Sequence, residues 1–361
     1  MDLVLETVDT FVFDKVYSKL FPYELIHNVG SEWINKLDLQ SYAADNCTML
    51  SETVKMVNSQ PHVNMDVYGH TPFLFDVTDY TFKSLLPRYN LIREAFSLWI
   101  IVTFFGWLLY LSFATMSYIF VFDRTIFNHP RYLQNQLRME MKLALSAIPW
   151  MSLLTVPWFV LELNGHSKLY WSDPKKDWTN IVKEIASFIF FTDCGVYLAH
   201  RWLHWPNVYR ILHKPHHKWL VCTPFASHAF NPVDGYFQSL PYHLYPMIFP
   251  LQKASYLCLF TFVNFWTIMI HDGNHMYNNK IVNGTACHTV HHLYFSYNFG
   301  QFTTLWDRLG GSYRRPEDAL FDKSPIKDEA ALKEQLEQVE LEMKLLEGDN
   351  DERVYIEKKK A

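Results

Sequence analysis

Residues Ala95 to Phe122 read AFSLWIIVTFFGWLLYLSFATMSYIFVF, and this stretch decides the fold. It carries no charged side chain in 28 residues, whereas roughly 20 apolar residues suffice to cross the hydrocarbon core of a bilayer. A soluble protein rarely buries a helix of that length that is apolar on every side. The stretch therefore predicts a transmembrane helix.

Further along the chain are four more apolar runs, which are shorter or less pure: Leu143–Leu161, Ile185–Ala199, Tyr236–Leu251 and Ala254–Ile270. Asp193 lies in the second of them, and Gln238 and His243 lie in the third. Either run could lie in the membrane interface or face the protein interior. Trp and Tyr crowd the ends of the runs, as an interfacial aromatic belt requires. We therefore expect a multi-pass, all-α integral membrane protein.

The remaining composition excludes other classes of protein. A net charge of -5 gives no nucleic-acid-binding signature. The five cysteines are scattered and odd in number, so they predict neither a disulfide framework nor a CxxC metal pair. The first residues, MDLVLETVDT, lack the basic region of a cleaved signal peptide. We expect the first span to serve as an uncleaved anchor.

Eight histidines form three short clusters, which we call the histidine boxes. Box one holds His200 and His204, box two holds His213, His216 and His217, and box three holds His288, His291 and His292. Positions i, i+3 and i+4 share one face of a helix, so each box can aim its imidazoles at one point. A lone histidine is usually a core residue, but adjacent imidazoles repel when protonated. Neutral imidazole is a common metal ligand, and eight are too many for one ion. The boxes predict two metal ions.

The residues between the histidines indicate which metal is bound. A zinc hydrolase would need HExxH with a glutamate base, whereas Arg, Trp and Leu separate His200 from His204. Structural zinc takes four ligands, often including cysteine. A site rich in imidazole instead favours non-haem iron that activates dioxygen. Two irons can supply the electrons that cleave O–O and form an oxidant for an unactivated C–H bond. Beside a membrane, the substrate would be a lipid.

Composition divides the chain into four segments. Residues 1–94 form an N-terminal membrane-associated region, 95–270 a transmembrane region with boxes one and two, 271–316 a cap with box three, and 317–361 a charged helix and tail. The helix begins near Lys327 and is expected to be solvated or to cover the cap. All boxes must meet, so an even number of crossings must separate boxes two and three. Residues 236–270 are long enough for such a hairpin.

The boxes match those of the membrane fatty acid hydroxylase/sterol desaturase superfamily, which this chain resembles. Longer motifs look like the fungal sterol C5-desaturases: FFTDCGVYLAHRWLHWP, LHKPHHKW, TPFASHAF, PVDG, MIHDG and NGTACHTVHHLYFSYNFGQFTTLWDRLGGSYR. The resemblance covers about residues 70–316. The run after box three is more specific than the boxes themselves.

The resemblance implies transmembrane helical hairpins with a cytosolic helical cap that holds a histidine-rich site for two iron ions. It also implies oxidation of a Δ7-sterol to a Δ5,7-diene in ergosterol synthesis, with O2 as oxidant. Electrons would come from NAD(P)H through cytochrome b5 and its reductase. The protein would reside in the endoplasmic reticulum membrane with its boxes and C-terminus cytosolic. Lys358-Lys359-Lys360-Ala361 fits a dilysine retrieval signal there, and the sequon at Asn46 fits a lumenal N-terminal region.

Some residues outside the boxes are further candidates for the metal site. His271, in the HDG motif, and His228 are possible additional ligands. Members of the resembled family usually have a second histidine where this chain has Asn231, so that position cannot be an essential ligand here. Asp193 could hydrogen-bond a ligand imidazole and fix its tautomer, or it could pair with Arg201. Asp234, Asp272 and Asp307 are weaker candidates for the same role.

Four cations interleave with boxes one and two: Arg201, Arg210, Lys214 and Lys218. They could steer an acidic electron donor such as cytochrome b5, or they could be ordinary membrane-surface charge. Box spacing alone does not separate a desaturase from a sister C4-methyl sterol oxidase or lipid hydroxylase. A metal transporter is a rival from another class. It predicts ligands within the spans and repeated halves, whereas here the ligands lie at span ends and the sequence shows no repeat.

Overall fold

The computed structural model describes residues 1–22, 75, 78–88, 90–171, 177–275, 280–316, 329–348 and 351–356. The sequon at Asn46 and the dilysine tail lie outside these ranges. Among the described residues the only sheet is one parallel pair, β1 (Leu169–Tyr170) with β2 (Leu251–Gln252). The rest of the regular structure is helical, which confirms the predicted all-α class. The fold divides into unit 1, residues 1–104 and 155–168, and unit 2, residues 105–154 and 169–361.

Unit 1 contains the N-terminal helical segment. Its first turns are α1 (Asp2–Val8), a π-helical turn (η1, Asp9–Phe13) and α2 (Asp14–Leu20). A short 3-10 helix follows (η3, Asp79–Phe82). Leu5, Phe13 and Leu98 are among its buried apolar residues. The part of the chain that precedes the first span therefore contributes buried apolar side chains to unit 1.

A buried ionic cluster lies inside unit 1. Asp14 accepts hydrogen bonds from Arg88 Nη2 at 2.5 Å and Arg93 Nη2 at 2.6 Å, and Arg93 also reaches Asp9 at 2.9 Å. These four side chains are at most 2% exposed. Removing one partner would leave an uncompensated charge in the interior, which typically costs about 3–5 kcal/mol.

Within the part of the chain that the structure describes, three helices are long and apolar enough to cross a membrane. They are α6 (Leu91–Phe120), α7 (Gln136–Leu163) and α12 (Lys253–Ile270). They contain two of the predicted runs whole and the first run up to Phe120, and they indicate a membrane protein. The other two runs form parts of α8 (Trp178–Leu203) and α11 (Pro232–Ile248), which do not qualify as spans by this measure.

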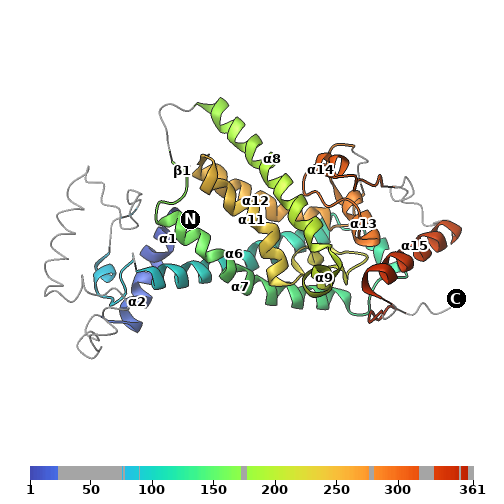
Figure 1. Cartoon of the computed structure of the whole chain (residues 1–361). Helices are drawn as coiled ribbons and strands as arrows, with labels where there is room; N and C mark the ends of the chain where they lie inside the picture. The colour runs from blue at the N-terminus through green and yellow to red at the C-terminus, as the bar shows by residue number, and fades with distance from the viewer. Residues whose placement is uncertain are drawn as a thin grey trace. The chain divides into compact units, whose positions relative to one another are not determined.

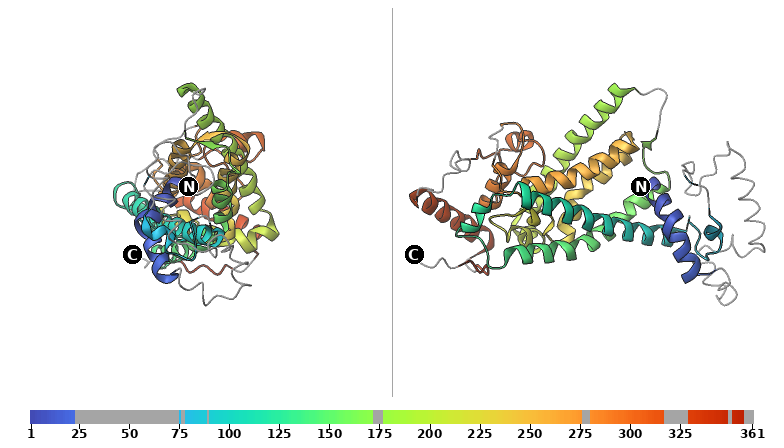
Figure 2. Two further views of the ribbon diagram at one scale, coloured as in Figure 1. Left: turned by 90° about the vertical axis from the view of Figure 1, so that its left-hand side faces the viewer. Right: turned by 180° about the vertical axis from the view of Figure 1, so that it is seen from behind.

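Within unit 2, small residues bring helices close together. A Cβ placed on Gly106 of α6 would lie 2.9 Å from Ile148 of α7. Trp107 Nε1 nearby donates to the carbonyl of Leu145 at 3.0 Å. Gly195 of α8 serves the same purpose, since an added Cβ would lie 2.7 Å from Pro241 of α11. Figures 1 and 2 show α11 lying along α8.

Residues 236–270, for which a hairpin of two spans is predicted, form most of α11, then β2 and α12; of these helices α12 qualifies as a span and α11 does not, so the pair of crossings stays a prediction. Pro241 and Pro246 lie inside α11, where each removes a backbone hydrogen bond and bends the helix. Leu251 pairs with Leu169 at the turn. Boxes two and three, which this segment joins, meet in the structure.

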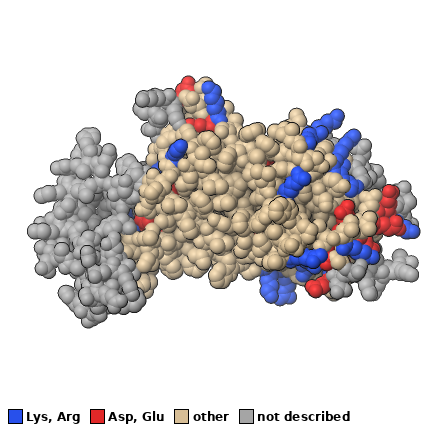
Figure 3. Space-filling model, in the orientation of Figure 1, with Lys and Arg blue, Asp and Glu red and all other residues tan. Residues whose placement is uncertain are grey.

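The remainder of unit 2 is a helical cap. Box three lies on α13 (Thr285–Tyr294), followed by α14 (Leu305–Leu309) and α15 (Glu329–Glu347). Val339 and Met343 of α15 are buried with Val290 and Leu293 of α13, and Figures 1 and 2 show the two helices side by side. Of the two expectations for this helix, the structure shows it packed on the cap. In Figure 3, Lys and Arg gather around these three helices, and few charges cover α11 and α12.

Candidate metal centre

Box one occupies the end of α8. His200 is buried on the face of this helix that also carries Asp193, Val196 and Tyr197, and His204 is the residue that ends the helix. The two histidines are one turn apart, so their rings lie on the same side. Asp177 caps the other end of α8 by accepting the backbone N–H groups of Thr179 and Asn180. α8 therefore has a capped N-terminus and carries box one at its C-terminus.

Box two lies on a short, irregular helical segment. A π-helical turn (η5, Tyr209–His213) leads directly into α10 (Lys214–His217). Pro215 is tolerated there because the first turn of a helix leaves its N–H groups unpaired. π-turns occur often at functional sites. Here the turn places His213 and His217 on a shared side, with ring centres 4.7 Å apart.

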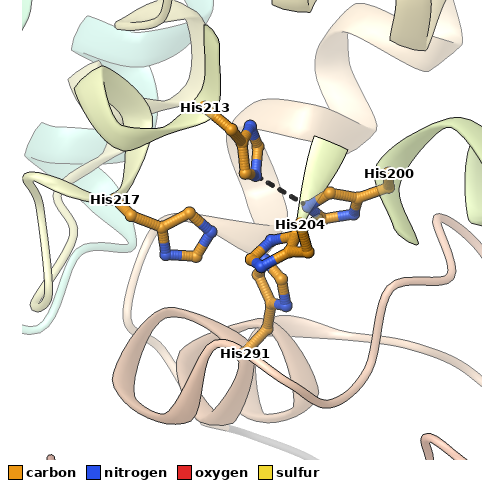
Figure 4. A group of neighbouring side chains, drawn as sticks. All are labelled: His200, His204, His213, His217 and His291. Atoms are coloured by element: carbon orange, nitrogen blue, oxygen red, sulfur yellow. Dashed lines mark hydrogen bonds between the residues drawn. The ribbon is translucent and has the colours of Figure 1, made fainter. Parts of the chain in front are cut away.

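The boxes meet in two groups whose members come from different elements. His200, His204, His213, His217 and His291 form the five-histidine group; His216, His271, His288 and His292 form the four-histidine group. Within each group the nitrogen atoms that could bind a metal lie within 4.8 Å of one another. Figure 4 shows the rings of the five-histidine group pointing toward one another.

The spacing of the nitrogens fits metal ions. Imidazole binds zinc at about 2.1 Å, so two nitrogens at right angles around such an ion lie roughly 3 Å apart. Nε2 of His200 lies 3.1 Å from Nε2 of His213. In the other group, Nε2 of His288 lies 2.9 Å from that of His271 and 3.1 Å from that of His292. These distances suit neighbouring ligands of one ion.

Several buried ring nitrogens have no hydrogen-bond partner among the described residues. They are both nitrogens of His204 and His217, Nδ1 of His216 and His292, and Nε2 of His291. Leaving a buried polar atom without a partner costs about 1–3 kcal/mol of stability. These unpaired nitrogens are therefore better explained as metal ligands than as parts of a packed core. The donor set fits two metal ions.

Burial keeps these imidazoles neutral. It lowers the pKa of His213 and of His271 to about 3. Burial, followed by the neighbouring imidazoles, lowers the pKa of every other histidine of boxes two and three well below the usual value. A neutral imidazole is the form that binds metal. The site is therefore in its ligating form at neutral pH.

Nδ1 of four of the clustered histidines is held by the protein. His213 Nδ1 lies 2.7 Å from Asp234 Oδ2. Backbone carbonyls serve the others: Phe299 for His200 at 3.0 Å, Thr267 for His271 at 2.6 Å and Tyr297 for His291 at 2.7 Å. Each contact fixes the tautomer, leaving Nε2 to face the metal.

Two buried carboxylates hold the loop that follows box three. Asp193 accepts the backbone N–H of Phe302 at 2.7 Å and is also bonded by Gln301 and Thr303. Asp307 accepts the N–H groups of Phe299 and Gly300, both at 2.8 Å. The Phe299 carbonyl, which orients His200, is thereby fixed. The sequence motif after box three thus forms the loop that these carboxylates hold beside His200.

The structure distributes the predicted roles differently among the carboxylates. Among the described residues, the hydrogen bonds of Asp193 go to the loop after box three and not to a box histidine or Arg201. Asp234, a weaker candidate, contacts His213 directly. The only sequence signal for Asp234 was its place in the PVDG motif. Its distance of 21 residues from His213 gave no helical or strand relation.

The two further ligand candidates have separate outcomes. His271 joins the four-histidine group, beside His288. His228 does not belong to either group; its Nε2 lies 3.2 Å from Asn264 Oδ1 and its Nδ1 lies 3.1 Å from the Ser227 hydroxyl. The ligand role of His228 thus has no geometric support, and the roles of the other nine remain predictions that their clustering favours.

Four cations interleave with boxes one and two, and we call them the rim cations: Arg201, Arg210, Lys214 and Lys218. All four make contacts within unit 2. Arg210 Nε donates to the Leu346 carbonyl at 3.3 Å, and Lys214 Nζ lies 3.4 Å from Glu347. Arg201 donates to the Gly310 carbonyl at 2.8 Å, and Lys218 lies over the ring of Trp219. Arg201 and Arg210 keep exposed side chains. The rim is therefore an ordered surface around boxes one and two.

Comparison with known proteins identifies the family. A sequence profile described as fatty acid hydroxylase matches residues 185–312, which include all nine clustered histidines. A protein of Candida glabrata named Delta(7)-sterol 5(6)-desaturase is 65% identical over 100% of this chain and 99% of its own length. The Saccharomyces cerevisiae protein of that name is 61% identical, over 98% of this chain and 97% of its own length. No solved structure matches. Identity at this level over whole chains means that the protein belongs to the Delta(7)-sterol 5(6)-desaturase family of oxidoreductases.

Proposed function

We propose that this chain desaturates a Δ7-sterol between C5 and C6, giving the Δ5,7-diene of ergosterol synthesis. The observation that carries the proposal is the pair of buried imidazole groups in a chain whose relatives are named Delta(7)-sterol 5(6)-desaturase. The membrane spans that flank the site supply a route for a lipid substrate. The whole length of the chain is shared with these relatives.

The metals in this proposal are two iron ions. The five-histidine and four-histidine groups would each hold one, since imidazole nitrogen suits iron and neither group contains a cysteine or carboxylate ligand. The ions supply activation of O2. The sterol loses two hydrogen atoms. O2 accepts these two hydrogen atoms together with two electrons and two protons from the donor, and forms two molecules of water.

The residues of the chain position and enclose the site. Asp234 and the carbonyl of Phe299 orient the rings of His213 and His200. The aromatic rings of Tyr209 and Phe295 lie 5.7 and 5.0 Å from the ring of His217 and cover the five-histidine group with apolar surface. Such a cover excludes water, which would otherwise compete for a reactive oxidant.

Electrons would reach the site from NAD(P)H through cytochrome b5 and its reductase. The rim cations, of which Arg201 and Arg210 are exposed, fit an acidic donor. The proposal includes a cytosolic position for the boxes and the C-terminus, at the endoplasmic reticulum membrane, where such a donor could reach them. It predicts that the rate of reduction by cytochrome b5 falls as ionic strength rises.

Sterol analysis of cells that accumulate Δ7-sterols tests the proposal. Cells given this chain should form the conjugated diene, and cells given the His216→Ala variant should not. His166→Ala is the matched control, because His166 is exposed and belongs to unit 1 rather than to either histidine group. A hydroxylated sterol in place of the diene would assign the chain to a sister oxidase and reject the proposal. Full activity of His216→Ala would reject the metal role of box two.

A further inference from the structure

The last described residues, Asp351–Ile356, form a segment that we call the C-terminal strap. Its backbone pairs with the segment before α7: Gln134 N donates to the Val354 carbonyl at 3.0 Å, and Ile356 N donates to the Tyr132 carbonyl at 3.2 Å. The ring of Tyr355 lies beneath the guanidinium of Arg131, with 5.1 Å to its centre. The strap thus has a defined position in unit 2.

One side chain of the strap reaches the backbone of box two. Arg353 Nη2 donates to the carbonyl of His217 at 2.9 Å, and Arg353 Nε donates to the carbonyl of Lys218 at 3.3 Å. Both carbonyls lie at the C-terminal end of α10 (Lys214–His217). The last carbonyls of a helix have no partner within it, and an arginine there supplies the missing donors and a favourable charge.

The guanidinium is itself held by a buried carboxylate. Arg353 binds Glu347 through two hydrogen bonds of 3.0 and 2.8 Å, and their side chains are 5% and 2% exposed. Burial alone would raise the pKa of Glu347, but the hydrogen bonds and charge of Arg353 hold that pKa below its usual value. The pair fixes the position of the planar guanidinium, as two-point binding of a carboxylate does.

The same carboxylate continues to the metal site through Tyr209. The Tyr209 hydroxyl donates to Glu347 at 2.8 Å. This tyrosine is fully buried, and its ring lies 5.5 Å from that of His204 and 5.7 Å from that of His217. Arg353 therefore contacts the backbone of box two. Glu347 holds Tyr209, whose ring lies against the imidazole rings of the site.

From this geometry we propose that Arg353 is a positioning residue for the metal centre, which acts by fixing α10 through the carbonyls of His217 and Lys218. α10 carries His216, which belongs to the four-histidine group, next to His217, which belongs to the five-histidine group. A shift of this short helix would move one ligand of each metal. The inference rests on the proposed metal-binding function.

Rates of metal release test this role. Purified full-length protein loaded with iron is mixed with a coloured iron chelator, and the release of iron is followed for wild type, Arg353→Gln, Arg353→Lys and Arg131→Gln. Loss of an outer partner of a metal ligand costs about 10–100-fold in metal affinity, so Arg353→Gln should release iron at least about tenfold faster. Arg353→Lys should rescue release only in part, because an ammonium has no planar fork. Arg131→Gln removes a contact to the strap at Tyr355, away from box two, and should behave as wild type.

A second measurement separates positioning from general stability. The ligand-field absorption spectrum of cobalt-substituted protein reports the geometry of the metal, and thermal unfolding reports the fold. The proposal predicts an altered cobalt spectrum in Arg353→Gln. A lower unfolding temperature with wild-type iron release and a wild-type spectrum would overturn it. If Arg353→Gln does not fold, Arg353→Lys is decisive, and wild-type release and spectrum in that variant would also overturn the proposal. Wild-type protein that holds no metal would instead reject the proposed function.

Discussion

At the scale of single residues, the metal site is a set of rings whose orientation is fixed from outside. The contact between His213 Nδ1 and Asp234 Oδ2 shows this most clearly, since the other oxygen of Asp234 accepts a hydrogen bond from Gln238 at 2.7 Å. The carboxylate is thereby held in one orientation. A carboxylate behind a ligating imidazole also makes it a stronger donor to the metal.

Replacing Asp234 by asparagine should weaken metal binding. The amide has nearly the same shape, but it lacks the charge and its NH2 group can face the N–H of His213. We expect metal affinity to fall by about 10–100-fold, measured by competition with a chelator of known affinity. Asp177→Asn makes the same change at the exposed cap of α8 and should leave the affinity unchanged. Wild-type affinity in Asp234→Asn would contradict the role given to this carboxylate.

The box histidines could be predicted from the sequence, whereas of their outer partners only Asp234 was a candidate, and a weaker one than Asp193. His200 and His204, or His288 and His292, are related by one helical turn, so local spacing alone places their rings together. Asp234, the Phe299 carbonyl and Arg353 come to the site only through the tertiary fold. No periodicity links them to the ligands.

At the scale of elements, the site depends on the loop from Phe299 to Thr303. Asp193 from α8 and Asp307 from α14 accept hydrogen bonds from its backbone N–H groups. Burial raises the pKa of Asp307, and the hydrogen bonds from Gly300 and Ser312 oppose that rise. The loop is held by hydrogen bonds that its own backbone supplies.

Asp307→Asn should destabilise the cap and reduce activity. The amide NH2 would face at least one of the N–H donors of Phe299 and Gly300 and leave it unpaired, at a cost of about 1–3 kcal/mol. Thermal unfolding and sterol turnover are the measurements. Ser312→Ala removes one donor to Asp307 but leaves the carboxylate, so its effect should be smaller. Equal stability of Asp307→Asn and wild type would show that the loop is held by other contacts.

Elements were predictable where hydropathy alone defines them. α6, α7 and α12 follow from apolar runs, and α15 follows from its helical spacing of Val339 and Met343. The π-helical turn before α10 was not predictable, because it depends on fitting box two between α8 and α13. α8 combines an apolar run with Asp193 and His200. Its composition therefore could not show whether the helix crosses the membrane, lies in the interface or faces the protein interior.

At the scale of the whole molecule, burial of the nine imidazoles couples folding to pH. The folded-state pKa of His213 and of His271 is about 3, whereas an unfolded histidine has a pKa of about 6.5. Between these values the unfolded chain binds more protons than the folded chain. Stability is therefore present above pH 6.5 and is lost as the pH falls from about 6.5 toward 3.

Metal-free protein should accordingly unfold at a lower temperature at pH 5.5 than at pH 7.5. Bound metal opposes this loss, because ions bind only the neutral imidazoles of the folded state. Thermal unfolding of metal-free and metal-loaded protein at the two pH values measures both effects. An unfolding temperature of the metal-free protein that does not change with pH would mean that the histidines are not buried as described.

The central claim is that nine histidines build two metal sites in one chain. Elemental analysis of purified, active protein tests it most directly, with His275→Ala as the control for His271→Ala, because His275 lies four residues away and contacts Thr289 instead of the four-histidine group. The account predicts two metal ions per chain in wild type and in His275→Ala, with loss from the four-histidine group in His271→Ala. Active wild-type protein with one ion or none, or a full complement of equally tightly held metal in His271→Ala, would contradict it.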